Sequence, residues 1–219
     1  MNIFDIIGPI MIGPSSSHTA GAVRIGRVAR KILGEDAARA DIGLFGSFAM
    51  TYKGHGTDKA IIAGILGMRP DDERIIDSLS IARDSGLEYE FSPVKLANAH
   101  PNTAVISLTG KNGASCIVEG ASVGGGVIKI TKLNGMTAAF DGTTYTLIVA
   151  HNDRAGAIAA VTDKLAQFGV NIGSFHLSRP KRNELAIMTI ELDSGIEKCV
   201  VNELRELNNI VSVVYMQPH

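Results

Sequence analysis

The 219-residue chain has no surplus of either charge, no long apolar run and only two cysteines. Its 21 Lys and Arg against 22 Asp and Glu leave a formal net charge of −1, whereas nucleic-acid-binding surfaces usually carry a strong basic excess. No apolar stretch approaches the roughly 18 residues needed to cross a bilayer, and MNIFDIIGPI has no basic region ahead of its apolar residues. We therefore expect a globular cytoplasmic protein that binds neither nucleic acid nor membrane.

The scarcity of cysteine also limits metal chemistry. Cys116 and Cys199 are far apart in the sequence and show no CxxC spacing, which argues against a disulfide framework or a complete zinc site. We interpret both as reduced, buried thiols. No residue of this chain is predicted to bind a metal.

Residues 1–142 predict a first domain of class α+β. Apolar residues at helical spacing indicate a helix over 20–33, whose other face carries Arg24, Arg27 and Lys31 and is interpreted as solvated. DIGLFGSF predicts a strand over 41–48, followed by a helix with Thr57 as N-cap and Gly67 as its stop, and a helix over 72–85. From about residue 87 the period becomes two, so a run of antiparallel strands should complete the domain.

Residues 145–219 predict a second domain with the order βαββαβ. The expected strands are 145–151, 170–178, 184–192 and 211–217, and the expected helices are 156–168 and 196–207. Four strands with two helices on one face form the ferredoxin-like arrangement.

The segment GPSSSHT, directly before the first helix, is the strongest candidate site. Hydroxyls and backbone N–H groups at a helix start favour an anion such as a carboxylate or a phosphate. A simple N-cap is the alternative, but it requires only one Ser or Thr. The candidate substrate-binding residues are Ser15, Ser16, Ser17 and Thr19.

A second polar segment, YKGHGTDKA, places His55 between two glycines, again just before a helix. We expect His18 and His55, each at a loop-to-helix junction, to line one pocket with a proton-transfer residue in it. HPNT and ASVGGG are weaker candidates. The glycines at 124–126 indicate a bulge or a close backbone contact, for packing or for a ligand.

Taken together, these motifs resemble the beta subunit of the bacterial iron-sulfur L-serine dehydratases. The similarity runs from FDIIGPIMIGPSSSHTAGAVRIGRVAR through LFGSFAMTYKGHGTDKAIIAGILG, HPNT and GASVGGG into the C-terminal module. That module resembles an ACT domain, and the first domain resembles the alternate substrate-binding type. The expected fold is therefore an alternate-substrate-binding-like domain, 1–142, followed by an ACT-like domain, 145–219.

The resemblance implies conversion of L-serine to pyruvate and ammonia at a 4Fe-4S cluster. Such a cluster needs at least three thiolates, and this chain has two cysteines. The cluster is therefore expected on a separate alpha subunit, as the partner of this chain. His18 and His55 would then do the acid–base work, with His18 ranked first.

The ACT-like domain implies an effector site at the first strand-to-helix loop, with L-serine as the expected ligand. The effector-binding candidates are Asn152, Asp153, Ala155, Gly156 and Asn171. Such sites usually form between paired modules, so self-association through this domain is expected. The alternative overall function is a stand-alone amino-acid-binding regulatory protein.

Overall fold

The computed structural model describes residues 10–218. Residues 4–9, which begin the N-terminal stretch of the resemblance, lie outside the described part. The chain forms two compact units, residues 1–134 and 135–219, and the division predicted near 142–145 stays a prediction. None of the helices between residues 10 and 218 combines the length and apolarity needed to cross a bilayer.

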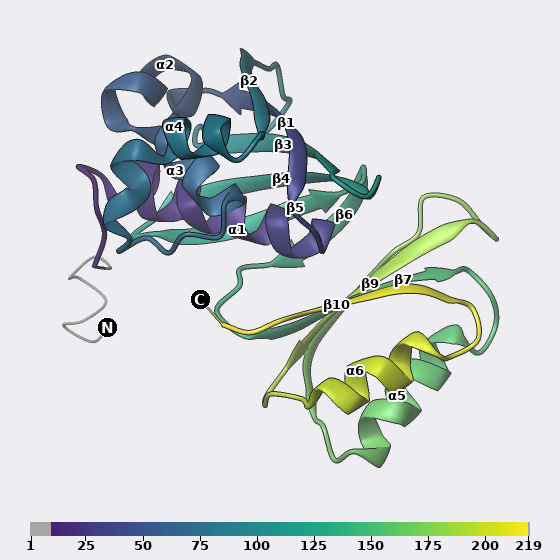
Figure 1. The fold of residues 1–219 in the computed structure, drawn as a ribbon. Helices are drawn as coiled ribbons and strands as arrows, with labels where there is room; N and C mark the ends of the chain where they lie inside the picture. Colours follow the sequence, from purple (N-terminus) through teal and green to yellow (C-terminus); the bar gives the residue numbers. More distant parts are fainter. Residues whose placement is uncertain (1–9, 219) are drawn as a thin grey trace. The chain divides into compact units, whose positions relative to one another are not determined.

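A mixed sheet with the order β2-β1-β3-β4-β5-β6 organises the N-terminal part of the chain (Figure 1). Its strands are β1 (Ala37–Phe45), β2 (Glu88–Pro93), β3 (Thr103–Gly110), β4 (Ser115–Gly124), β5 (Val127–Leu133) and β6 (Met136–Phe140). β1 and β2 are parallel, whereas β1–β3, β3–β4 and β4–β5 are antiparallel. The α+β class is confirmed, with one parallel pair that the strand pattern did not predict.

Helices connect the two parallel strands. The crossover contains α2 (Ser47–His55), α3 (Thr57–Ile65), a short 3₁₀ helix (Glu73–Asp77) and α4 (Ser78–Asp84). The helix predicted over 72–85 is therefore divided into a 3₁₀ turn and an α-helix. Ahead of β1, the π-helix η2 (Ser16–Gly21) continues directly into α1 (Ala22–Leu33).

The strand predicted over 41–48 is wrong at its end, because β1 stops at Phe45 and α2 begins at Ser47. Phe48 is the only residue of α2 that is fully buried, so the helix has almost no apolar periodicity to detect. Thr57 is also not an N-cap. Gly56 occupies that position in the left-handed region, with φ 69°, and no side chain caps the helix.

α1 and α3 lie side by side (Figure 1), and their backbones approach each other at two glycines. A Cβ added at Gly26 would lie 2.4 Å from the carbonyl oxygen of Ile61, and one added at Gly64 would lie 2.1 Å from that of Val23. Only glycine permits helix backbones to come this close. The same packing places η2, which extends α1, against α3.

The predicted solvated face of the first helix is partly wrong. Arg24 donates to the carbonyl oxygen of Gly126, and Arg27 donates to those of Gly67 and Met68. Both guanidinium groups are half-buried, and that burial lowers the pKa of each. Lys31 alone is exposed. Gly124 ends β4, and Gly125 and Gly126 form the turn to β5; all three have positive φ.

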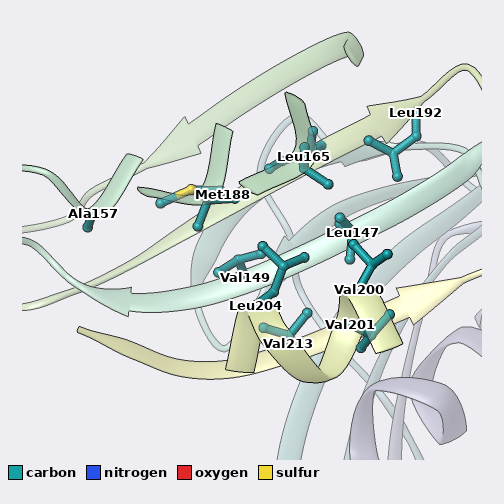
Figure 2. Packing of buried hydrophobic residues seen from close by; sticks show 12 residues of the cluster. Leu147, Val149, Ala157, Leu165, Met188, Leu192, Val200, Val201, Leu204 and Val213 are labelled. Carbon is teal, nitrogen blue, oxygen red and sulfur yellow. The ribbon is translucent and has the colours of Figure 1, made fainter. Parts of the chain in front are cut away.

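The C-terminal unit contains the βαββαβ module predicted from the sequence. Its elements are β7 (Tyr145–Asn152), α5 (Ala157–Gln167), β8 (Ile172–Ser178), β9 (Leu185–Leu192), α6 (Lys198–Arg205) and β10 (Ile210–Met216). The strand order β10-β7-β9-β8 is fully antiparallel. Alternate residues of the strands, such as Leu147 and Val149, meet Val161, Leu165 and Leu204 of the two helices in one apolar core (Figure 2).

Candidate functional site

His18 lies at the centre of the polar residues that the sequence singled out. It is the third residue of η2 and only 8% exposed. Its Nδ1 lies 3.3 Å from Ser15 Oγ, and its Nε2 lies 3.3 Å from Ser47 Oγ. Both ring nitrogens are therefore in contact with hydroxyl groups, one from its own loop and one from α2.

Two rings of α2 enclose the imidazole of His18. Phe48 meets it edge-on, with ring centroids 5.2 Å apart, and His55 lies closer, with centroids 4.7 Å apart and planes at 83°. The expectation that the two histidines lie together agrees with this geometry. The expected position of His55 is wrong, because it is the exposed last residue of α2 rather than part of a loop.

The two weaker motifs lie beside the same helix. A Cβ added at Gly21 of η2 would lie 2.1 Å from Ser122 Oγ, so β4 packs directly on the π-helix. The backbone N–H of Ser122 donates to the carbonyl oxygen of Asn102, and the N–H of Phe48 donates to that of Pro101. ASVGGG thus contacts η2, and HPNT contacts α2, the two helices that carry His18 and His55.

The serine-rich loop has distinct roles for its hydroxyls. Ser15 is the N-cap of η2, where its Oγ accepts from the backbone N–H of His18. Ser16 and Ser17 form the half-buried first turn, where helical amides lack intrahelical partners. Thr19 is 2% exposed and lies against Gly13, where an added Cβ would be 2.3 Å from Thr19 Oγ1.

Three buried hydroxyls around η2 have no hydrogen-bond partner within residues 10–218: Thr19 Oγ1, Thr57 Oγ1 and Ser122 Oγ. Burying a hydroxyl without a partner is costly. Thr57 and Ser122 are fully buried. Apolar side chains of similar size would fill these three positions without the cost of an unpaired hydroxyl. Packing alone therefore does not explain why the three residues are polar.

Electrostatics favour a neutral imidazole at His18. Burial of the ring lowers its pKa, and the neighbouring His55 lowers it further. A neutral imidazole offers one N–H donor and one lone pair. It is the form that can both give and take a proton near neutral pH.

Ser47 was not predicted as a site residue from the sequence. It follows a strand and a single glycine. This strand–glycine–serine order is the one local signal that could have placed Ser47 at the start of a helix. Gly46 has φ 59° and ψ −125°, a conformation that side chains disfavour. A Cβ there would lie 2.6 Å from the carbonyl oxygen of Pro101.

The cysteines do not fit an iron-sulfur cluster. The thiol of Cys116 donates to the carbonyl oxygen of Ala29, and burial raises its pKa to about 11, whereas cluster ligands are thiolates. Cys199 is exposed in the other unit, which corrects the interpretation of two buried thiols. Between residues 10 and 218, no three His, Cys, Asp or Glu side chains are grouped as metal ligands.

In the C-terminal unit, the candidate effector loop forms hydrogen bonds with residues of the same module. The Asp153 carboxylate accepts from the N–H of Asn183 at 2.9 Å and from Arg179 at 3.3 Å. These two partners lower the pKa of Asp153. Ala155 is exposed, and Gly156 is the N-cap of α5, with φ 89° and no side-chain cap.

Asn171 lies at the other end of the sheet from this loop. It precedes Ile172, which pairs with Leu192, whereas Asn152 pairs with Leu185. Seven strand steps of about 3.3 Å separate the two ends by roughly 20 Å. Asn171 donates instead to Asp193. Within one module, therefore, Asn171 does not face the β7–α5 loop.

Comparisons with known families identify both units. Residues 144–209 match the model described as the ACT domain, and residues 2–85 match the model described as the serine dehydratase beta chain. The fold is thus that of an ACT-domain protein whose other unit carries the buried His18 beside the exposed His55.

Curated relatives extend the match to nearly the full chain. The "Probable L-serine dehydratase, beta chain" of Bacillus subtilis (strain 168) is 47% identical over 97% of this chain and 96% of its own length. The "L-serine dehydratase, beta chain" of Peptoniphilus asaccharolyticus is 37% identical over 98% and 97%. "L-serine dehydratase 2" of Escherichia coli (strain K12) is 41% identical over 38% of this chain and 19% of that protein. The chain belongs to the family of L-serine dehydratase beta chains.

Proposed function

We propose that this chain supplies the histidine-bearing part of an L-serine dehydratase active site that is completed by an alpha subunit. The overall reaction converts L-serine into pyruvate and ammonia. The observation that carries the proposal is the buried His18, which has a serine hydroxyl at each ring nitrogen and His55 edge-on at 4.7 Å. A purely structural core would not require this set of polar groups.

In this proposal, the residues at and before the π-helix bind the substrate, and the two histidines transfer protons. Ser15, Ser16, Ser17 and Thr19 bind the substrate carboxylate, since helix-start amides and hydroxyls suit an anion. His18 and His55 move protons, and His18 ranks first because its lowered pKa keeps the ring neutral. His55 is exposed on α2, where it is accessible to a substrate.

The 4Fe-4S cluster of this enzyme belongs to the alpha subunit. Supporting this are the protonated, hydrogen-bonded thiol of Cys116 and the remoteness in sequence of Cys199. The beta-chain names of the full-length relatives agree with a separate partner chain. The assembly is a cytoplasmic heteromer, in keeping with the balanced charge of the chain.

Anaerobic reconstitution tests this proposal. The chain is co-expressed with its alpha partner, and pyruvate release from L-serine is measured for wild type, His18→Ala and His55→Ala. General acid–base groups contribute about 10²–10⁴-fold, so each variant should lose at least about 100-fold in kcat. Lys53→Ala, an exposed residue of the same helix, is the matched control and should retain wild-type activity. Full activity of both histidine variants, or of the alpha chain alone, would refute the proposal.

We further propose that the ACT domain binds L-serine as an effector between two copies of the module. The loop Asn152–Gly156 of one copy would meet Asn171 of the other, since one module holds them at opposite ends. Isothermal calorimetry on the full chain should show L-serine binding that Asn171→Ala abolishes. A wild-type chain that binds no L-serine at millimolar concentration, or that stays monomeric when it binds, would contradict this assignment.

A further inference from the structure

Backbone contacts on both sides of Ser47 fix its position. It is the first residue of α2, directly after Gly46. Gly46 contacts Pro101 so closely that no Cβ fits there, and Phe48 N–H donates to the carbonyl oxygen of the same proline. One turn later, Thr51 Oγ1 donates to the carbonyl oxygen of Ser47 at 2.9 Å. The Ser47 hydroxyl is therefore presented to His18 from a rigid turn.

The hydroxyl groups on either side of His18 allow two arrangements of hydrogens, one for each tautomer of the ring. Ser15 Oγ already accepts from the backbone N–H of His18, so its own hydroxyl hydrogen remains to be donated. The ring atom within hydrogen-bonding distance of Ser15 Oγ is His18 Nδ1, at 3.3 Å. If Ser15 donates to Nδ1, that nitrogen carries the lone pair, and the single hydrogen of a neutral imidazole lies on Nε2.

The Nε2 hydrogen then has one acceptor, Ser47 Oγ, also at 3.3 Å. In this arrangement only the hydroxyl hydrogen of Ser47 has no acceptor among these three residues. In the reverse tautomer, Ser15 Oγ would accept from both Nδ1 and the backbone N–H through its two lone pairs, and the hydroxyl hydrogen of Ser15 would be the one without an acceptor. Only the first arrangement leaves the N-cap bond of Ser15 Oγ unshared with a second donor.

We propose that Ser47 is a positioning residue for His18, which accepts the Nε2 hydrogen and so fixes the plane and the tautomer of the imidazole. This inference rests on the proposed proton-transfer role of His18. In this arrangement the lone pair of Nδ1 faces the Ser15 hydroxyl, and the Nε2 hydrogen faces Ser47 Oγ.

Nitrogen NMR of the full-length, ¹⁵N-labelled chain tests the proposal without an activity assay. Long-range ¹⁵N–¹H spectra distinguish the two imidazole tautomers, and the signals of His18 are those lost in His18→Gln. We expect the wild-type ring, above its pKa, to be protonated at Nε2. A ring protonated at Nδ1 would overturn the proposal, and this measurement requires no variant at Ser47.

The two serines should move the His18 pKa in opposite directions. Ser47 accepts from Nε2–H, and that bond strengthens when the ring is charged, so Ser47→Ala should lower the pKa by about half a unit to one unit. Ser15→Ala removes a bond that favours the neutral ring and should raise the pKa. Ser47→Thr keeps the hydroxyl and should restore the wild-type value, and Met50→Ala, at an exposed residue of the same helix, should leave it unchanged.

An unchanged pKa in Ser47→Ala, or shifts of the same sign in both serine variants, would refute the positioning role. In the reconstituted enzyme, Ser47→Ala should lower kcat by about 10-fold or more, with Ser47→Thr restoring it. The two proposals can fail separately. An Nε2-protonated ring in an enzyme that tolerates His18→Ala would refute only the catalytic role, and an Nδ1-protonated ring in an enzyme that needs His18 would refute only the role of Ser47.

Discussion

Replacing Gly64 with alanine should destabilise the N-terminal unit through the contact between α1 and α3. The added Cβ would lie 2.1 Å from the carbonyl oxygen of Val23 and 2.9 Å from the backbone nitrogen of Arg27. Real Cβ contacts essentially never fall below 3.0 Å, so the helices would have to separate by about 0.9 Å. Both obstructing atoms are backbone, and no side-chain rotation can relieve the clash.

The magnitude follows from two opposing terms. Overpacking a tight core costs about 1–3 kcal/mol, and the clash with two backbone atoms places Gly64→Ala at the upper end. Alanine in place of glycine inside a helix returns about 1 kcal/mol. We therefore expect the free energy of unfolding of this unit to fall by about 2 kcal/mol.

Hydrogen–deuterium exchange of α1 and α3 peptides at increasing urea concentration measures this unit separately from the ACT domain. The matched control is Gly54→Ala in α2, where an added Cβ meets nothing within 4 Å and φ is not positive. That substitution should stabilise by about 0.4–1 kcal/mol. A Gly64→Ala chain as stable as wild type would refute the close helix contact, and with it the reason why η2 lies against α3.

Two further predictions concern titration and thiol reactivity. Burial lowers the folded-state pKa of His18 below 6.5, so the unfolded chain binds more protons at this residue and stability should be lost as pH falls through about 6.5 toward the folded pKa. In urea titrations between pH 7 and pH 5, His18→Gln should lose less stability than wild type. Equal losses in the two chains would contradict the lowered pKa. A thiol-specific maleimide at pH 8 should label exposed Cys199 and leave Cys116 unmodified, since burial raises the pKa of Cys116 to about 11. Labelling is measured by mass spectrometry, and equal labelling of both cysteines would disprove the burial of Cys116.

The C-terminal module was predictable because its signals are local. The short apolar runs within 145–151 and 184–192 mark strands, and consecutive residues of both strands are buried. Gly169 ends the first helix with φ 66°. The four strands have few ways other than one sheet covered by two helices to bury these apolar residues. The pattern therefore leads directly to the βαββαβ order.

The site in the N-terminal unit was only half predictable. Residue types identified Ser15, His18 and His55, because hydroxyls and histidines beside glycines at a helix start are more polar than capping requires. No apolar periodicity marks α2 as a helix, since Phe48 is its one buried residue. Ser47 therefore stayed hidden, although it contacts His18 Nε2.

The sequence by itself determined the ACT module and the polar residues from which the candidate site is built. Only the tertiary structure decided which of them meet. The close contact of Gly26 and Gly64 sets η2 against α3, and the turn at Gly46 directs Ser47 toward His18. These contacts join residues more than 25 positions apart, and neither periodicity nor capping, which act within a few residues, carries information over that separation.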